Sequence, residues 1–259
     1  MSCPDPWADL KRHTAARIAL GRSGASQPTA AWLQFSLDQA LARDAVRAAL
    51  DVAALQAALA AHALDAIAIE SAAPDRASYL RRPDLGRRLS PRSAAVLAAL
   101  PAAAAGSIAV LVADGLSAAA AQAHALPLLL ALRPRLQAQG QALGPVVIAT
   151  QARVALGDAV GALTGAAAVL VLLGERPGLS SPDSLGAYLT WAPRPGRSDA
   201  ERNCVSNIRP AGLPHAEAAR RLAWLLAAAR RLGASGVALK DESDAPALQG
   251  PARYGTIPP

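Results

Sequence analysis

From residue 64 onward, short apolar runs alternate with longer helical stretches, and this alternation constrains the fold more than any other feature of the chain. The runs have the length and the branched apolar content of buried strands. They cover residues 64–70, 107–113, 145–150, 167–173 and 236–240, with helices expected between them at 93–100, 117–139, 154–163 and 215–232. Such alternation is typical of a mostly parallel sheet with helices on both faces. We therefore predict an α/β, Rossmann-like fold, with residues 188–192 as one more strand candidate.

The chain before residue 64 has helical patterns and lacks a strand pattern. Helices are expected over 8–20, 29–50 and 52–63, the first of them capped by Asp5. The second would present an apolar face made of Trp32, Phe35, Leu37 and Leu41. We therefore predict a small N-terminal helical domain, 1–62, followed by a Rossmann-like domain, 63–259.

Polar or glycine-containing loops follow three of the predicted strands, at 114–115, 151–154 and 174–175. In open α/β sheets, ligands bind beyond the carboxyl ends of the strands. The apolar run that ends near residue 173 stops abruptly at Gly-Glu-Arg-Pro-Gly, and the segment after it is rich in Pro, Gly, Ser and Arg. It also carries distinctive residues: Trp191, Asn203, Cys204 and Asn207. We predict a loop that carries part of a site.

The chain is basic, with a formal net charge of +7 and a pI near 10.4. Nucleic acid is one reading of this charge, but the arginines are scattered and only 3% of residues are aromatic, so stacking platforms for bases are few. A solvated Arg-rich surface is favoured over nucleic-acid binding, and pairing of some arginines with a partner subunit is a third reading.

Several catalytic and binding templates are missing. The sequence has no G-x-G-x-x-G, no Gly-Lys pair of a phosphate-binding loop and no G-x-S-x-G. Its four histidines, at positions 13, 62, 124 and 215, show no metal-ligand spacing, and each is interpreted as a surface or packing residue. No D-x-H-x-x-G pattern offers a histidine to cobalt. We predict no metal-binding residues on this chain.

Two long segments, G-E-R-P-G-L-S-S-P-D-S-L-G-A-Y from residue 174 and E-R-N-C-V-S-N-I-R-P from residue 201, are similar to signature segments of the small (light) subunit of ethanolamine ammonia-lyase. Further matches, in the same order as in that family, are D-P-W-A-D-L-K-R-H near the start, Y-L-R-R-P-D-L-G-R-R-L from 79, A-D-G-L-S from 113 and R-V-A-L-G-D from 153. The resemblance covers essentially the whole chain.

The resemblance implies a hetero-oligomer with a large subunit, in the form of a heterododecamer, that uses adenosylcobalamin in its base-on form. In that enzyme the cobalt–carbon bond breaks homolytically, hydrogen is abstracted from ethanolamine, and acetaldehyde and ammonia are released. The large subunit holds the substrate, so no catalytic residue is expected on this chain. The resemblance implies that Val154, Glu175 and Cys204 contact the cofactor.

Each of these positions also has a plain structural reading. Glu175 could form an ion pair with Arg176 or cap a turn, Val154 could be a first-turn helix residue, and Cys204 could be a small buried hydrophobe. For Glu175 the resemblance favours the functional reading, because the amide groups around a corrin ring need hydrogen-bond acceptors. The chain departs from the family where Ala152 replaces a glycine and where the following helix lacks acidic residues.

Cys3 and Cys204 form no disulfide framework, and the first residues include no apolar signal segment, so a cytoplasmic protein outside any membrane is expected. Bacterial microcompartments are a second location, reached through the large subunit. Two alternative functions remain open: a free-standing cobalamin-binding module without lyase activity, and a nucleic-acid-binding protein.

Overall fold

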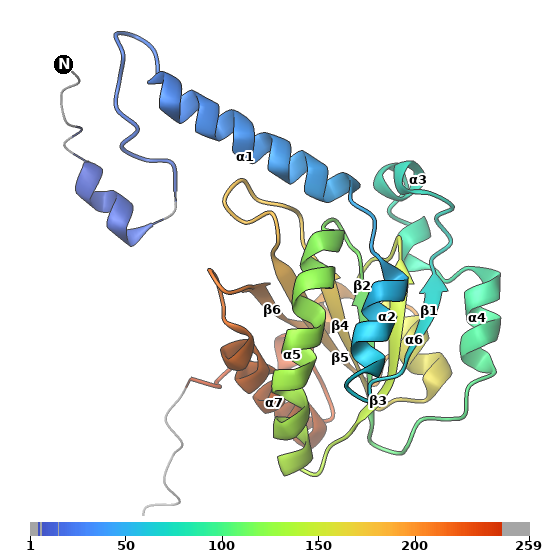
Figure 1. Ribbon diagram of the computed structural model, residues 1–259. Coiled ribbons are helices and arrows are strands. Elements are labelled where there is room, and N and C mark those ends of the chain that lie inside the picture. The colour runs from blue at the N-terminus through green and yellow to red at the C-terminus, as the bar shows by residue number, and fades with distance from the viewer. Residues whose placement is uncertain (1–4, 6, 15, 245–259) are drawn as a thin grey trace, which may run out of the picture.

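The computed structural model describes residues 5, 7–14 and 16–244 and is built around one six-stranded sheet (Figure 1). The strands are β1 (Ala66–Glu70), β2 (Ile108–Ala113), β3 (Leu143–Thr150), β4 (Ala168–Gly174), β5 (Leu185–Trp191) and β6 (Arg202–Ile208). Their order across the sheet is β1-β3-β2-β4-β5-β6. The first four strands are parallel, whereas β5 and β6 add to β4 as an antiparallel hairpin. The mostly parallel α/β sheet predicted from the sequence is confirmed.

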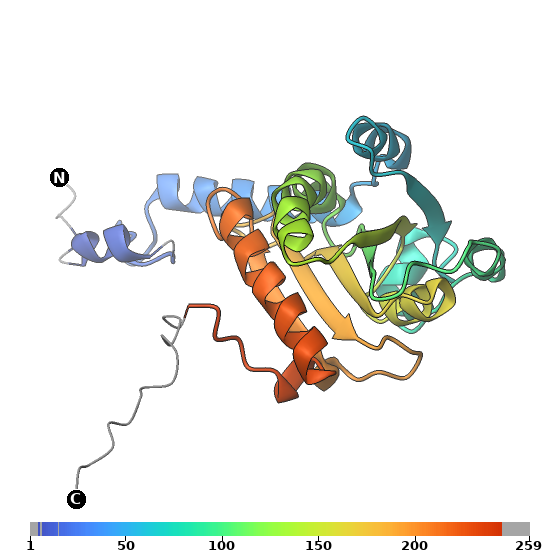
Figure 2. The same cartoon turned by 90° about the horizontal axis from the view of Figure 1, so that it is seen from below.

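Helices cover both faces of this sheet (Figure 2). They are α1 (Thr29–Arg47), α2 (Val52–Ala60), α3 (Arg76–Arg81), α4 (Pro91–Ala98), α5 (Ala118–Ala138), α6 (Leu156–Thr164) and α7 (His215–Leu232), with short 3-10 turns at Ala8–His13, Leu85–Arg87, Asp199–Glu201 and Gly236–Ala238. One apolar core joins the sheet to α2, α5 and α7, and a second joins the opposite face to α4 and α6. Strand β2 is buried along its whole length, as its unbroken apolar sequence predicts.

The hairpin extends the sheet past the helices of the second face. Tyr188 and Thr190 of β5 and Arg202 of β6 lie on that face, and α6 reaches this part of the sheet through Asp158. The other face of the hairpin packs into the core with α5 and α7 through Leu185, Ala187, Leu189, Val205 and Ile208. Part of the second face of the hairpin is therefore left accessible.

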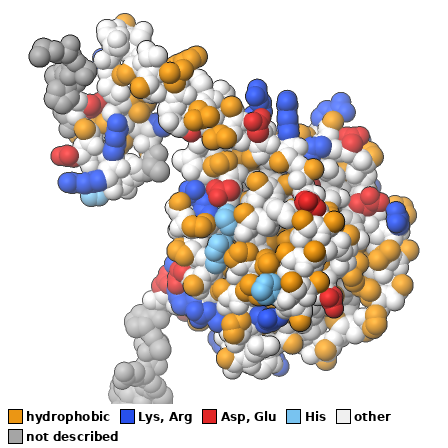
Figure 3. All heavy atoms as spheres, viewed as in Figure 1, with side chains coloured by type: hydrophobic (Ala, Val, Ile, Leu, Met, Phe, Trp, Pro, Cys, Tyr) orange, Lys and Arg blue, Asp and Glu red, His pale blue; other side chains and the backbone are white. Residues whose placement is uncertain are grey.

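The N-terminal segment forms an arm that projects from the sheet body (Figure 1). Helix α1 buries only Ala45, while Trp32 is 58% exposed and Leu37 is 53% exposed. Figure 3 shows apolar side chains along this arm. In contrast, α2 inserts Leu55 and Leu59 into the core of the sheet body. The domain boundary at residue 62 stays a prediction. Helix α2 lies before this boundary but packs against the predicted second domain.

Three expectations about individual elements were wrong. The helix expected over 8–20 is only a 3-10 turn, Ala8–His13, because none of its residues is buried and an unsupported short helix is marginal in water. The strand expected at 236–240 is a 3-10 turn, Gly236–Ala238. The stretch around Cys204, expected as a loop, is the edge strand β6. Among the described residues, no helix is long and apolar enough to cross a bilayer.

Candidate functional site

The loops after β2 and β3 are held together by one buried carboxylate, that of Asp114. Its Oδ2 accepts a hydrogen bond from the Gln151 backbone N–H at 2.9 Å, and its Oδ1 accepts one from the Ala152 N–H at 3.1 Å. Arg76 lies 3.4 Å from the same carboxylate. Burial raises the pKa of Asp114, while the backbone donors and Arg76 oppose that rise. Two of the three loops predicted at the carboxyl ends of the strands are thus fixed to each other.

The third loop joins them through a glycine contact. The Leu116 N–H donates to the Gly174 carbonyl at 2.8 Å. A Cβ atom on Gly174 would lie 1.9 Å from the Ser117 carbonyl oxygen, and one on Gly115, which has φ +54°, would lie 2.1 Å from the Gly174 oxygen. Only glycine lets the two backbones approach this closely. The corner fixes where the chain leaves β4 and therefore where Glu175 starts.

Tyr79 supports the segment after β3. Two guanidinium groups stack on its ring, with the Arg76 Cζ 4.9 Å and the Arg153 Cζ 4.3 Å from the ring centroid. Its hydroxyl donates to the Ala152 carbonyl at 3.0 Å, and burial raises its pKa to about 12. The Arg153 N–H donates to the Gly86 carbonyl at 2.8 Å. The segment that carries Val154 is therefore held by α3 and by the turn after it.

Glu175 is half-buried and held by the hairpin. Its Oε2 accepts a hydrogen bond from the Ser184 hydroxyl at 2.7 Å, and its Oε1 lies 3.5 Å from the Tyr188 hydroxyl. Among the described residues it forms no ion pair with Arg176, which removes one of its plain structural readings. The carboxylate borders an open pocket of about 350 Å³ lined by Tyr79, Leu116, Arg153, Leu173, Gly174, Glu175, Arg176 and Tyr188.

Cys204 joins this group through Tyr188, its direct partner in the β5–β6 register. Poor hydration of the thiol raises its pKa to about 11, the charge of Glu175 adds to the rise, and the Tyr188 hydroxyl opposes it. Desolvation, Cys204 and Glu175 likewise raise the pKa of Tyr188. The thiol is therefore protonated near neutral pH and poorly suited to act as a nucleophile. Cys204 is exposed and does not line the pocket of Glu175; it lines a separate pocket together with Asn207 and Arg221.

Val154 lies just before α6 and lines a neighbouring pocket of about 310 Å³. This second pocket is lined by Arg87, Arg153, Val154, Ala155, Leu173, Arg197, Ser198 and Asp199. Arg153 and Leu173 line both pockets, so the two hollows adjoin along the carboxyl ends of the parallel strands. The structure thus places Val154 and Glu175 in adjoining pockets at the carboxyl ends of the parallel strands. Cys204 lies apart from both, in the middle of β6 opposite Tyr188, and lines a third pocket of about 390 Å³.

Buried polar atoms without a partner gather at the same place. Among the described residues five such side-chain atoms occur, and three of them belong to this edge: Arg76 Nη2, Gln151 Oε1 and Arg153 Nε. Gln151 also has φ +56°, a conformation that costs a non-glycine residue about 1 kcal/mol or more. Unsatisfied polar atoms and backbone strain commonly mark sites that act on a ligand.

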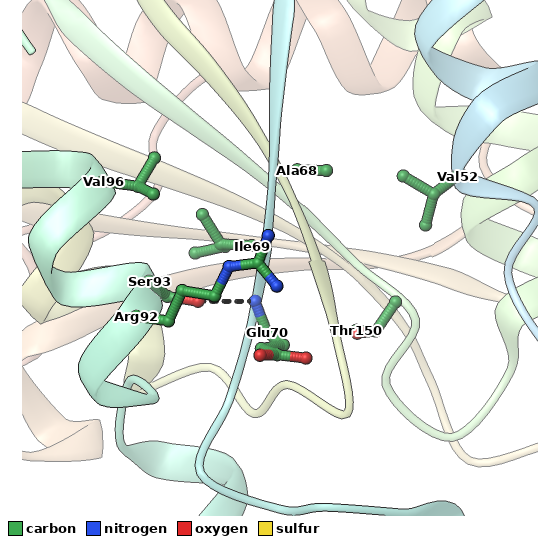
Figure 4. A pocket seen from close by; sticks show the side chains of 8 residues that line it. All are labelled: Val52, Ala68, Ile69, Glu70, Arg92, Ser93, Val96 and Thr150. Atoms are coloured by element: carbon green, nitrogen blue, oxygen red, sulfur yellow. Dashed lines mark hydrogen bonds between the residues drawn. The ribbon is translucent and has the colours of Figure 1, made fainter.

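Other features of the chain lie outside this edge. A groove of about 260 Å³ runs along the free side of β1 between α2 and α4, where Ser93 Oγ accepts the Glu70 N–H at 2.9 Å (Figure 4). None of the predicted site residues lines it. His124 and His215 are far apart in sequence, but His124 Nδ1 lies 3.2 Å from His215 Nε2. His124 Nε2 lies 3.3 Å from Asp183 Oδ2. No cluster of metal-ligating side chains is found in the part of the chain that the structure describes.

Sequence reasoning missed Tyr188, Tyr79 and Arg153 as parts of the site. Each occurs in a quoted family segment, and with only three tyrosines in the chain their positions were a usable signal. What the sequence could not show is that the strand carrying Tyr188 pairs with the one carrying Cys204.

Comparison with known proteins shows similarity over nearly the whole chain. The family model of the ethanolamine ammonia-lyase light chain (EutC) matches residues 4–240. The ethanolamine ammonia-lyase small subunit of Bradyrhizobium diazoefficiens is 56% identical over 255 residues, covering 98% of this chain and 96% of the relative. The small subunit of Azotobacter vinelandii is 54% identical over 248 residues, covering 95% and 92%. The small subunit of Rhodopseudomonas palustris is 56% identical over 237 residues, covering 91% and 90%. This chain belongs to the ethanolamine ammonia-lyase light chain family.

Proposed function

We propose that this chain is the small subunit of an adenosylcobalamin-dependent ethanolamine ammonia-lyase and that it holds the cofactor, base-on, against the large subunit. The relatives are named small subunits of that enzyme. The observation that carries the proposal is that Glu175 contacts Tyr188, the strand partner of Cys204, in a pocket that adjoins the one containing Val154. When bound, the cofactor supplies radical chemistry for the conversion of ethanolamine to acetaldehyde and ammonia.

The residues present suit a corrinoid. Its ring is apolar with a rim of amide groups, so it needs both packing surfaces and hydrogen-bond partners. Leu116, Leu173 and Val154 offer apolar contact along the two pockets. Glu175 Oε1 borders the first pocket and is an acceptor for amide N–H groups.

The base-on form is supported by the placement of the histidines. No histidine lines either pocket among the described residues. His124 and His215 instead contact each other near Asp183. The role of this chain is to bind and orient the cofactor and to exclude water from one side of it, and the substrate-binding and reacting groups belong to the large subunit.

A partner is also supported by the apolar surface of α1. Trp32, Leu33, Leu37 and Leu41 are each about half exposed, and contiguous exposed apolar side chains mark interaction surfaces. We place α1 against the large subunit in a heterododecamer. The assembly is expected in the cytoplasm, and enclosure in a bacterial microcompartment would depend on the large subunit, so this chain alone should not sediment with purified shells.

The test uses the two subunits purified together. Acetaldehyde release and cofactor affinity are measured for the parent complex and for Glu175→Ala, with Glu70→Ala as a matched control, since Glu70 ends β1 at a different groove. Loss of one charge-assisted hydrogen bond predicts cofactor affinity weaker by about tenfold or more in Glu175→Ala and unchanged in the control.

Two outcomes would contradict the proposal, and a third would contradict only the role of Glu175 in it. Turnover by the isolated chain would mean that it carries catalytic residues. Tight cofactor binding by this chain without a partner, and without lyase activity in the complex, would favour a free-standing cobalamin-binding module. An unchanged cofactor affinity in Glu175→Ala would remove Glu175 from the site.

A further inference from the structure

Charged side chains line the pocket beside Val154, and the corrin contacts described above do not involve them. Four charged side chains line it: Arg87, Arg153, Arg197 and Asp199. Arg197 is ion-paired with Glu201 and donates to the backbone oxygens of Trp191 and Ala192. Asp199 lies 3.3 Å from Arg202 Nε, but its side chain is 90% exposed and Arg202 is already paired with the buried Asp158. The two remaining arginines, Arg87 and Arg153, therefore outweigh one carboxylate in this pocket.

These two arginines have free donors. Arg87 is exposed and makes no side-chain hydrogen bond or ion pair with any described residue. Arg153 is stacked on Tyr79, so its guanidinium is fixed, yet its Nε is buried without a partner and its Nη2 reaches only the Tyr79 carbonyl, at 3.4 Å. A guanidinium fixed by stacking beside an exposed one is a favourable arrangement for an anion with several oxygens.

The backbone adds to this positive region. Helix α6 starts at the pocket, and its first amides bond within the turn, Leu156 N–H to the Arg153 carbonyl and Gly157 N–H to the Val154 carbonyl, each at 3.0 Å. The N–H groups of Val154 and Ala155 have no hydrogen-bond partner among the described residues. The one acid in the first turn, Asp158, is neutralised by its buried pair with Arg202. The start of α6 therefore faces the pocket with a positive dipole end.

We propose that Arg87, Arg153 and the amides before α6 form a subsite for a phosphodiester, namely the phosphate that links the corrin ring to the nucleotide base of the cofactor. The inference rests on the proposed function and extends it, since it assigns the second pocket to a different part of the same molecule. The apolar wall shared by the pockets, Leu173, lies between the amide-binding and phosphate-binding groups. Recognition of the phosphate selects a complete cobalamin over a corrinoid that lacks the nucleotide loop.

The test compares two ligands on the complex of both subunits. Adenosylcobalamin and adenosylcobinamide, which lacks the phosphate and base, are titrated by equilibrium dialysis with visible absorbance. The variants are Arg87→Gln, Arg87→Lys and Arg81→Gln. Arg81→Gln is the matched control, because it removes the same charge from a nearby exposed arginine that lines neither pocket.

We expect Arg87→Gln to weaken adenosylcobalamin binding by about tenfold and to leave adenosylcobinamide binding unchanged, so that the preference between them shrinks. Arg87→Lys should retain part of the preference, and Arg81→Gln all of it. Equal weakening of both ligands, or no change in either, would overturn the subsite while leaving the proposed function intact. If the parent complex binds neither corrinoid, the proposed function fails, and the subsite fails with it.

Discussion

Arg202 and Asp158 form a buried, two-pronged ion pair between β6 and α6, with Nη1–Oδ1 and Nη2–Oδ2 distances of 2.6 and 2.7 Å. Both side chains are almost fully buried. Arg202 also donates to the Thr190 hydroxyl at 2.8 Å. The pair joins the edge strand to the helix that begins beside Val154, and so it fixes the positions of the two pockets relative to each other.

Removing one partner should be costly. Asp158→Asn leaves the Arg202 charge buried without a carboxylate, and we expect a loss of about 3–5 kcal/mol in the free energy of unfolding. Urea unfolding of the chain, followed by circular dichroism, measures it. The control is Asp84→Asn, which breaks an exposed, solvent-screened pair and should change the stability little. Equal small effects in both variants would show that the buried pair does not hold the hairpin.

The glycine corner predicts a second large effect. Gly174→Ala places a methyl group against the Ser117 backbone oxygen, which cannot move as a side chain can, so we expect at least about 3 kcal/mol of destabilisation and weaker cofactor binding. Gly144→Ala is the comparison, since its nearest neighbour, 3.1 Å away, is the Ser107 side chain. Thermal unfolding of both variants separates the cases. A Gly174→Ala protein as stable as Gly144→Ala would contradict the geometry.

The Cys204 thiol should react slowly with iodoacetamide at neutral pH and faster as the pH approaches about 11, the pKa to which its surroundings raise it. Because the Glu175 charge contributes to that rise, Glu175→Gln should lower the pKa and speed alkylation at a fixed pH. Tyr188→Phe should act in the opposite direction, since the hydroxyl favours the thiolate. Peptide mass spectrometry of the complex without cofactor distinguishes the alkylation of Cys204 from that of other cysteines. Identical alkylation rates in the parent and both variants would show that Glu175 and Tyr188 do not influence the Cys204 thiol.

The histidine contact predicts a pH dependence of stability. Burial, and then the neighbouring His124, lower the pKa of His215 from its ordinary value of 6.5. Below pH 6.5 the unfolded chain therefore binds more protons at this position than the folded chain does. The free energy of unfolding should thus decrease as the pH is lowered, until the pH is below the folded pKa. Urea unfolding between pH 7.5 and pH 5 of the parent and of His215→Gln measures this effect. A pH slope that is the same in both would assign it to other groups.

How far the sequence determined these features depended on burial. Fully buried strands such as β2 carry unbroken apolar runs and were located within a residue or two. β6 was missed because an edge strand alternates, and polar residues such as Asn203 and Ser206 dominate its sequence. The positions of Val154 and Glu175 beyond strand ends followed from the topology of parallel sheets. Tyr188 could not be found in that way, because its role comes from antiparallel pairing with Cys204, which local sequence does not encode.

The contact between Gly115 and Gly174 also limits how sequences of this fold can vary. A side chain at either position would need the other backbone to move away, and that movement would shift Glu175 and the start of α5 together. Single substitutions at either of these two positions should therefore not be tolerated. A homologue that replaces one glycine should carry a compensating insertion or a rebuilt loop at the other, and the loop that carries Glu175 should differ as well.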